Sequence, residues 1–158
     1  MKRSFKIGFS FGLTSGIITT LGLMVGLHSS TNSRFVIIGG ILTIAIADAF
    51  AESMGIHISQ ETENHIPIKE IWESTFCTFI SKFLFSSLFI IPILLLELHA
   101  AILISIIIGL YLIVLLSIAI ARERNNKAWK VVIEHVVISI IVIIFTHYVG
   151  LLISIMFS

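Results

Sequence analysis

Two carboxylates, Asp48 and Glu52, stand inside a long apolar stretch of the sequence. Because they are four residues apart, a helix would present both on one face. An aspartate near the centre of a membrane helix costs roughly 2.5–3.5 kcal/mol on insertion scales. The two charges also repel each other, so a cation, a proton or water must neutralise them. Divalent cations favour carboxylate oxygens, so the pair predicts a metal site within the membrane. The alternative is a protonated carboxyl that hydrogen-bonds a neighbouring helix.

Further polar residues accompany this pair. Ser59 continues its helical face, and the thioether of nearby Met54 would favour a transition metal. His57 lies roughly opposite Asp48 on a helical wheel and is a weaker candidate ligand. In the first apolar stretch, the hydroxyls of Ser15 and Thr19 either line an ion pathway or serve only in packing. We therefore expect Ser15, Thr19, Met54 and Ser59 to form the pathway around Asp48 and Glu52.

Glycines recur every four residues at Gly8, Gly12 and Gly16. This spacing allows two membrane helices to approach closely. We expect a homodimer that packs through the first helix.

An acidic cluster follows the second apolar stretch, in a predicted loop from about Ser59 to Thr75. It could gather divalent cations at the cytoplasmic mouth, or it could be only a solvated connection. Its members are Glu61, Glu63, His65, Glu70 and Glu73.

The elements that must position these residues are membrane helices. The chain has 158 residues, of which 57% are hydrophobic and only 12% are charged, so its apolar surface must face lipid. About 20 apolar residues cross a bilayer as a helix, and an isolated strand could not satisfy its backbone there. We predict a single transmembrane domain, an all-α bundle of five spans. The spans cover about residues 7–27, 35–58, 76–96, 100–121 and 131–157.

The basic residues predict the orientation of these spans. With the N-terminus inside, we place Lys69 and Lys82 beside the second loop, also inside. Nine of the ten Lys and Arg residues then lie in the cytoplasm and only Arg34 lies outside, as the positive-inside rule favours. Five spans put the C-terminus outside. A kink is expected at Pro92, and the single cysteine, Cys77, excludes an intramolecular disulfide.

The first two spans resemble the vacuolar iron transporter family. The matching stretches run from Gly12 to Gly26 and from Ala45 to Gln60, and the resemblance covers roughly residues 8–63. Members of that family have five helices, a cytoplasmic N-terminus and a dimer with a metal path between the first two spans. The other three spans match only in number and hydrophobicity.

This chain departs from the family pattern at several points. The family has Asp-Gly where Ser15-Gly16 stand here, and aligning its second-span glutamate with Glu52 puts Asp48 in the place of a methionine. A carboxylate thus moves from the first helix to the second, and the thioether is lost. The site becomes harder, which weakens the expected preference for iron over manganese. The family's helical metal-binding extension is replaced by about sixteen residues.

The resemblance implies a transporter, in the cell membrane, that exports Fe²⁺ or Mn²⁺ from the cytoplasm, with proton exchange as a plausible coupling. Asp48 and Glu52 would be its metal ligands. The alternative is a non-transporting scaffold or accessory protein that keeps the fold. The sequence contains no motif for catalysis, a resident cofactor or nucleic-acid binding.

Overall fold

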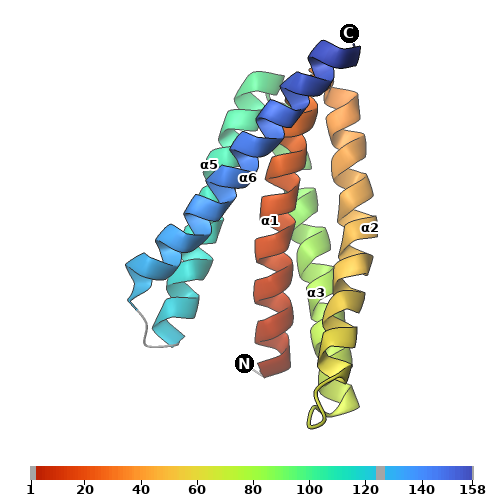
Figure 1. The fold of residues 1–158 in the computed structure, drawn as a ribbon, viewed down its shortest axis with the longest axis vertical. Helices are drawn as coiled ribbons and strands as arrows, with labels where there is room; N and C mark the ends of the chain where they lie inside the picture. The colour runs from red at the N-terminus through yellow and green to blue at the C-terminus, as the bar shows by residue number, and fades with distance from the viewer. Residues whose placement is uncertain (1–2, 124–126, 158) are drawn as a thin grey trace. The chain divides into compact units, whose positions relative to one another are not determined.

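The computed structural model describes residues 3–123 and 127–157, and all its regular elements are helices (Figure 1). Five stretches are long and apolar enough to cross a membrane, with α3 and α4 together forming the third. These findings confirm the predicted all-α fold and are consistent with an integral membrane protein, while the orientation stays a prediction. The helices are α1 (Arg3–Thr31), α2 (Arg34–Glu61), α3 (Ile68–Leu88), α4 (Ile90–Leu95), α5 (Leu98–Glu123) and α6 (Ala128–Phe157).

The connection between α2 and α3 is much shorter than the predicted loop. Only residues 62–67 lie between the two helices, so the expected loop from Ser59 to Thr75 is wrong at both ends. Pro67 sets the start of α3, because its carbonyl oxygen accepts the first backbone bonds, from Glu70 at 2.8 Å and Ile71 at 3.2 Å. The prediction relied on apolar content, which locates only the lipid-facing part of a helix. It therefore missed the polar first turns of α3.

The third span is interrupted at Phe89, between α3 and α4. Pro92 has no N–H to bond the carbonyl of Leu88, and its ring crowds the preceding turn. The break therefore comes three residues before the proline, in line with the kink that was expected there.

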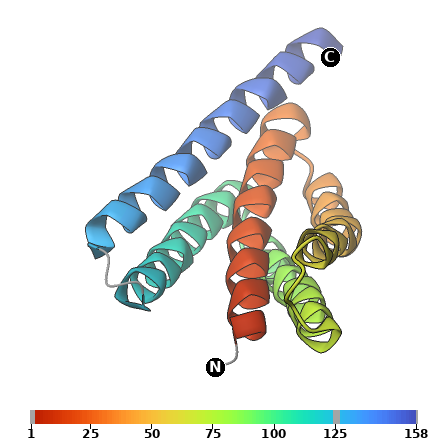
Figure 2. The ribbon, with the colours of Figure 1, turned by 60° about the horizontal axis from the view of Figure 1, so that its bottom comes forward.

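The chain divides into two compact units, and the first combines the described residues up to Ile17 with Leu42–Leu88. It contains the N-terminal part of α1, the C-terminal part of α2 and all of α3, drawn in red, gold and light green in Figure 2. The buried face of α3 is mostly polar, and the remaining faces of this helix carry apolar residues such as Phe76 and Leu84. The buried residues of α3 are Ile71, Ser74, Thr75, Thr78, Ser81, Lys82 and Ser86.

The glycines of α1 lie against this face of α3. A Cβ atom on Gly12 would be 2.5 Å from the carbonyl oxygen of Thr78, and one on Gly16 would be 3.1 Å from that of Lys82. Gly8 faces Ser74 in the same way. The glycine stripe is therefore filled within the chain, and assigning it to a dimer contact was wrong. A homodimer stays a prediction that needs a different surface.

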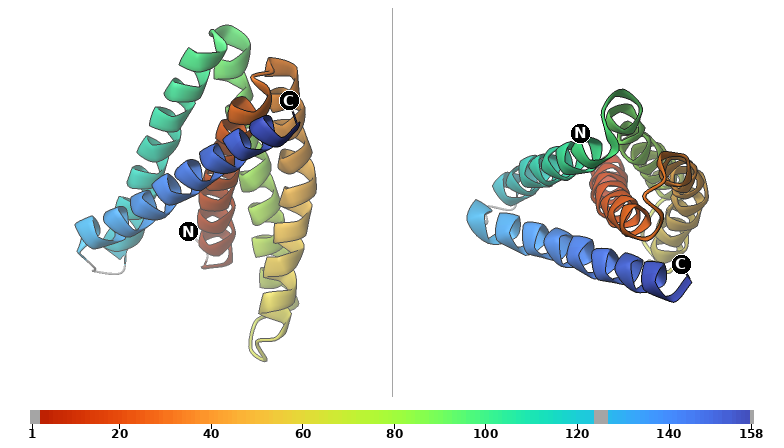
Figure 3. Two further views of the ribbon diagram at one scale, coloured as in Figure 1. Left: turned by 45° about the horizontal axis from the view of Figure 1, so that its top comes forward. Right: turned by 90° about the horizontal axis from the view of Figure 1, so that it is seen from above.

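The second unit combines residues 18–41 with the described residues from Phe89 onward. Within it α5 and α6 pack against each other as an antiparallel pair, drawn in green-blue and blue in Figure 3. In the same unit, α6 also packs closely against the C-terminal part of α1. This contact depends on a glycine, because a Cβ atom on Gly150 would meet the carbonyl oxygen of Gly26. Asn32, with a φ of 48°, ends α1 in the left-handed conformation that asparagine tolerates.

Candidate cation site

Asp48, Glu52, Ser15 and Lys82 meet inside the first unit, on three different helices. The Nζ atom of Lys82 on α3 is 2.5 Å from Asp48 Oδ2 and 2.5 Å from Glu52 Oε1, both on α2. It also donates a hydrogen bond to Ser15 Oγ on α1 at 2.8 Å. These four residues are called the ionic site below.

The ammonium group of Lys82 is fully satisfied in this arrangement. It has three N–H donors, and the ionic site supplies three oxygen acceptors. The Lys82 side chain is 0% exposed, whereas those of Asp48 and Glu52 keep 35% and 22% of their surface. A buried ammonium is tolerated only when it is paired and hydrogen-bonded in this manner.

Ser15 links the charges across the helices. Its hydroxyl accepts from Lys82 and donates to Glu52 Oε1 at 2.5 Å. The second carboxylate oxygen, Glu52 Oε2, is buried and has no hydrogen-bond partner. Lys82 thus contacts one oxygen of each carboxylate, and on Glu52 the other oxygen is left without a partner.

The position of Lys82 corrects two sequence predictions. It lies near the middle of the span Ile68–Leu95, not beside a cytoplasmic loop. The number of basic residues predicted on the cytoplasmic side therefore falls from nine to eight. The carboxylate pair was also expected to need an external counter-cation. Lys82 supplies that positive charge from within the chain.

Of the predicted pathway residues, only Ser15 joins the two carboxylates. Met54 is 45% exposed and Ser59 is also exposed, while the buried residues on that turn of α2 are Ser53, His57 and Gln60. Thr19 belongs to the second unit. The residues that share the ionic site thus come from α1, α2 and α3, and neither thioether nor imidazole is among them.

The acidic cluster is spread over several elements. Glu61 ends α2 and lies 3.3 Å from His57 Nε2, and Glu73 on α3 accepts a hydrogen bond from Ser4 at 3.0 Å. Glu63, His65 and Glu70 are exposed. Across residues 3–123 and 127–157, no three His, Cys, Asp or Glu side chains gather closely enough to hold a metal ion.

His57 has a defined structural role near the same end of the unit. The hydroxyl of Thr75 donates to the carbonyl oxygen of Ile71 at 2.8 Å and therefore accepts from His57 Nδ1 at 3.0 Å. The imidazole also packs edge-on against Trp72, with ring centroids 4.6 Å apart. His57 thus ties α2 to α3, the same helix that Asp48 contacts through Lys82.

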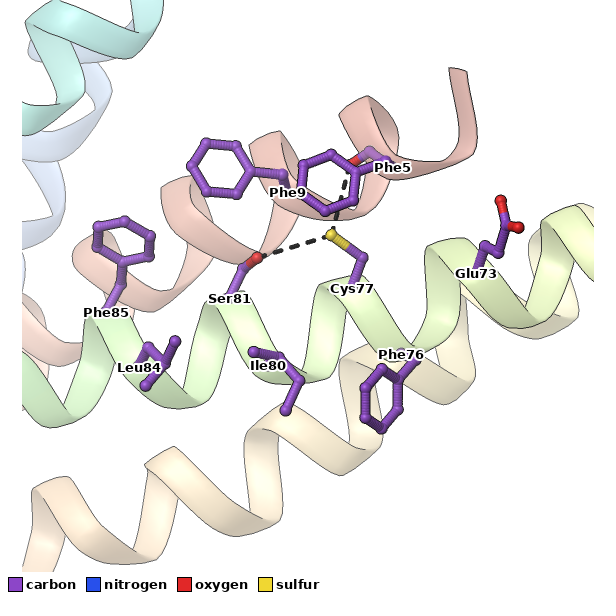
Figure 4. A pocket seen from close by; sticks show the side chains of 9 residues that line it. All are labelled: Phe5, Phe9, Glu73, Phe76, Cys77, Ile80, Ser81, Leu84 and Phe85. Atoms are coloured by element: carbon purple, nitrogen blue, oxygen red, sulfur yellow. Dashed lines mark hydrogen bonds between the residues drawn. The ribbon is translucent and has the colours of Figure 1, made fainter. Parts of the chain in front are cut away.

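A groove of about 820 Å³ runs along α1 and α3, and Figure 4 shows the side chains that line it. None of the ionic-site residues is among them. The thiol of Cys77 donates to the carbonyl oxygen of Phe5 at 3.4 Å. The lining residues are Phe5, Phe9, Glu73, Phe76, Cys77, Ile80, Ser81, Leu84 and Phe85.

The second unit has its own polar cluster, made of imidazoles and hydroxyls. His28 Nε2 lies 3.0 Å from His99 Nδ1, and Ser29 Oγ lies 2.7 Å from His147 Nδ1. Sequence analysis did not single out His28. It stands at the end of the glycine-rich first span, where its partner comes from a distant part of the chain.

Lys82 was the main residue that sequence reasoning assigned wrongly. A pattern in the sequence could have shown that Lys82 faces the protein interior. Its helical face carries hydroxyl residues at intervals of three and four, namely Ser74, Thr78, Ser81 and Ser86. A hydroxyl-bearing face on an otherwise apolar helix indicates an interior surface.

No protein-family model, no curated protein and no solved structure matches the chain. The likeness of its first two spans to the vacuolar iron transporter family therefore rests on the residues quoted above and stays a prediction.

Proposed function

We propose that this chain carries a divalent transition-metal cation, Fe²⁺ or Mn²⁺, out of the cytoplasm in exchange for protons. Asp48 and Glu52 would be the metal ligands, and the cell membrane is the expected location. As in the family it resembles, the working unit would be a homodimer. Lipid and the metal ion would be its other partners.

One observation carries this proposal: two carboxylates and a hydroxyl converge on a single positive charge within membrane-spanning helices. A cavity of oxygen atoms around a cation is what a hard divalent ion requires. Burying such a group is expensive, and ionisable residues inside a membrane usually mark ion or proton pathways.

The chemistry of the donors favours Mn²⁺ or Fe²⁺ held by oxygen. Asp48, Glu52 and Ser15 supply carboxylate and hydroxyl oxygens, and Glu52 Oε2 is free of other hydrogen bonds. A carboxylate that has released a metal ion can accept a proton, which supports exchange of the two. The exposed residues Glu63, His65 and Glu70 would raise the cation concentration near the entrance, together with Glu61 and Glu73.

Transport by the purified chain in lipid vesicles tests this proposal. We expect Mn²⁺ or Fe²⁺ uptake that falls at least about tenfold in Asp48→Asn and in Glu52→Gln, since each change removes one ligand charge. Glu97→Gln is the matched control, because it removes an exposed carboxylate outside both the ionic site and the acidic cluster. If Asp48→Asn transports as well as the unmodified chain, Asp48 serves only in packing.

A second function has a specific observation in its favour. Lys82 already satisfies Asp48 and Glu52, so the ionic site could act only as a structural tie in a non-transporting scaffold or accessory protein. This function predicts that no variant and no metal gives uptake above that of empty vesicles. Asp48→Asn and Glu52→Gln would then change stability alone.

A further inference from the structure

We infer that Lys82 is a tethered competitor for the transported cation: its ammonium holds the ionic site when no metal is bound, and an incoming divalent ion must displace it. This inference rests on the proposed function and adds a means of regulating the same site.

The geometry makes simultaneous occupancy unfavourable. The Lys82 ammonium is 2.5 Å from one oxygen of each carboxylate, so it stands where a metal shared by Asp48 and Glu52 would be coordinated. A divalent ion at that place would meet a positive charge within a few ångströms in a weakly screened environment. Metal and ammonium therefore exclude each other.

The unpaired oxygen of Glu52 gives the incoming ion a ligand. Glu52 Oε2 is buried and accepts no hydrogen bond, while Oε1 is occupied by Lys82 and Ser15. Because Oε2 is buried, an incoming ion first meets the part-exposed carboxylate of Asp48 and then takes up Oε2 as the ammonium leaves Oε1. Lys82 has a long, flexible side chain with three rotatable donors, so it can withdraw without a change in the helix backbone.

Release follows the same path in reverse. When the ammonium returns to Asp48 and Glu52, it replaces the metal and again offsets part of the negative charge of the two carboxylates. A lysine in this role weakens metal binding, because the metal can bind only the fraction of molecules in which the ammonium is displaced. Removing its charge should therefore tighten binding and slow release.

Direct binding of Mn²⁺ to the full chain in detergent, followed by electron paramagnetic resonance, tests this inference. We expect Lys82→Met to bind Mn²⁺ at least about tenfold more tightly than the unmodified chain. Lys82→Arg keeps the charge and should show no such gain. Lys82→Gln keeps two N–H donors without the charge and replaces Lys82→Met if that variant does not fold. Equal or weaker binding by a folded neutral variant overturns the inference.

A measurement on the unmodified chain covers the case in which both neutral variants fail to fold. Nuclear magnetic resonance of the chain with lysine labelled with ¹³C at Cε can follow Lys82, which should be the lysine whose signal survives reductive methylation. We expect this signal to shift on addition of Zn²⁺, with the same midpoint as Zn²⁺ binding. If that signal does not move at saturating Zn²⁺, Lys82 is not displaced and the inference is wrong.

Two controls separate this inference from the proposed function. Asp48→Asn and Glu52→Gln should lose Mn²⁺ binding if the ionic site takes the cation. If both bind as the unmodified chain does, the proposed site itself is wrong. If both lose binding while Lys82→Met shows no gain, the site is right and only the competition by Lys82 is wrong.

Discussion

The two units of the chain solve the same problem, polar groups among apolar helices, in different ways. The first unit brings full charges together, with the buried ammonium of Lys82 paired to the part-exposed carboxylates of Asp48 and Glu52. The second joins imidazoles and a hydroxyl without a carboxylate, as in the pair of His28 with His99 and the contact of Ser29 with His147. Charges in an apolar interior cost more to bury and bind more strongly when paired, so the first unit is where loss of one partner should matter most.

The largest effect should follow from removing the buried cation. Lys82→Met leaves Asp48 and Glu52 without a positive charge beside them, and breaking a buried ion pair costs about 3–5 kcal/mol. We expect Lys82→Met to unfold at a lower denaturant concentration than the unmodified chain. We also expect Mn²⁺ to raise the stability of Lys82→Met more than it raises that of the unmodified chain.

The matched variant for that experiment removes all three charges together. Lys82→Met with Asp48→Asn and Glu52→Gln leaves no unpaired charge, and its stability should return most of the way to that of the unmodified chain. If the triple variant is as unstable as Lys82→Met alone, the ion pairs are not the reason for the loss.

A smaller effect should come from the glycine contacts. Each unit has contacts of this kind between its own helices. Gly12→Ala places a methyl group against the backbone oxygen of Thr78, which cannot rotate away, so we expect a loss of about 1–3 kcal/mol. Gly55→Ala, in the same unit, has open space around its Cβ position and is the control. Equal unfolding midpoints for the two variants would contradict the close approach of α1 and α3.

The smallest effect should come from the pair of imidazoles in the second unit. His99→Ala removes one hydrogen bond between the imidazoles of His28 and His99, which is worth about 0.5–1.5 kcal/mol at most. We expect the unfolding midpoint of His99→Ala to lie close to that of Gly55→Ala and well above that of Lys82→Met. A loss as large as that of Lys82→Met would abolish the contrast between the units.

Hydropathy predicted the five spans because length and apolar content are properties of each segment alone. The i, i+4 spacing likewise placed Asp48 and Glu52 on one face of α2. Lys82 was misplaced because its role depends on which helix its face meets. The partner of the glycine stripe was misassigned for the same reason, since spacing indicates close packing without naming the second helix.

The order of helices along the chain gives the ionic site a consequence for biosynthesis. The hairpin of α1 and α2 is synthesised first, so in a membrane both carboxylates would be in place before α3 is made. A lysine near the middle of a lone membrane helix opposes insertion by roughly 2.5–3.5 kcal/mol. When α3 arrives, Asp48 and Glu52 offer its lysine a partner, and Gly8, Gly12 and Gly16 leave room for its backbone. In that order of insertion, the earlier hairpin would present the third helix with a binding surface for its lysine.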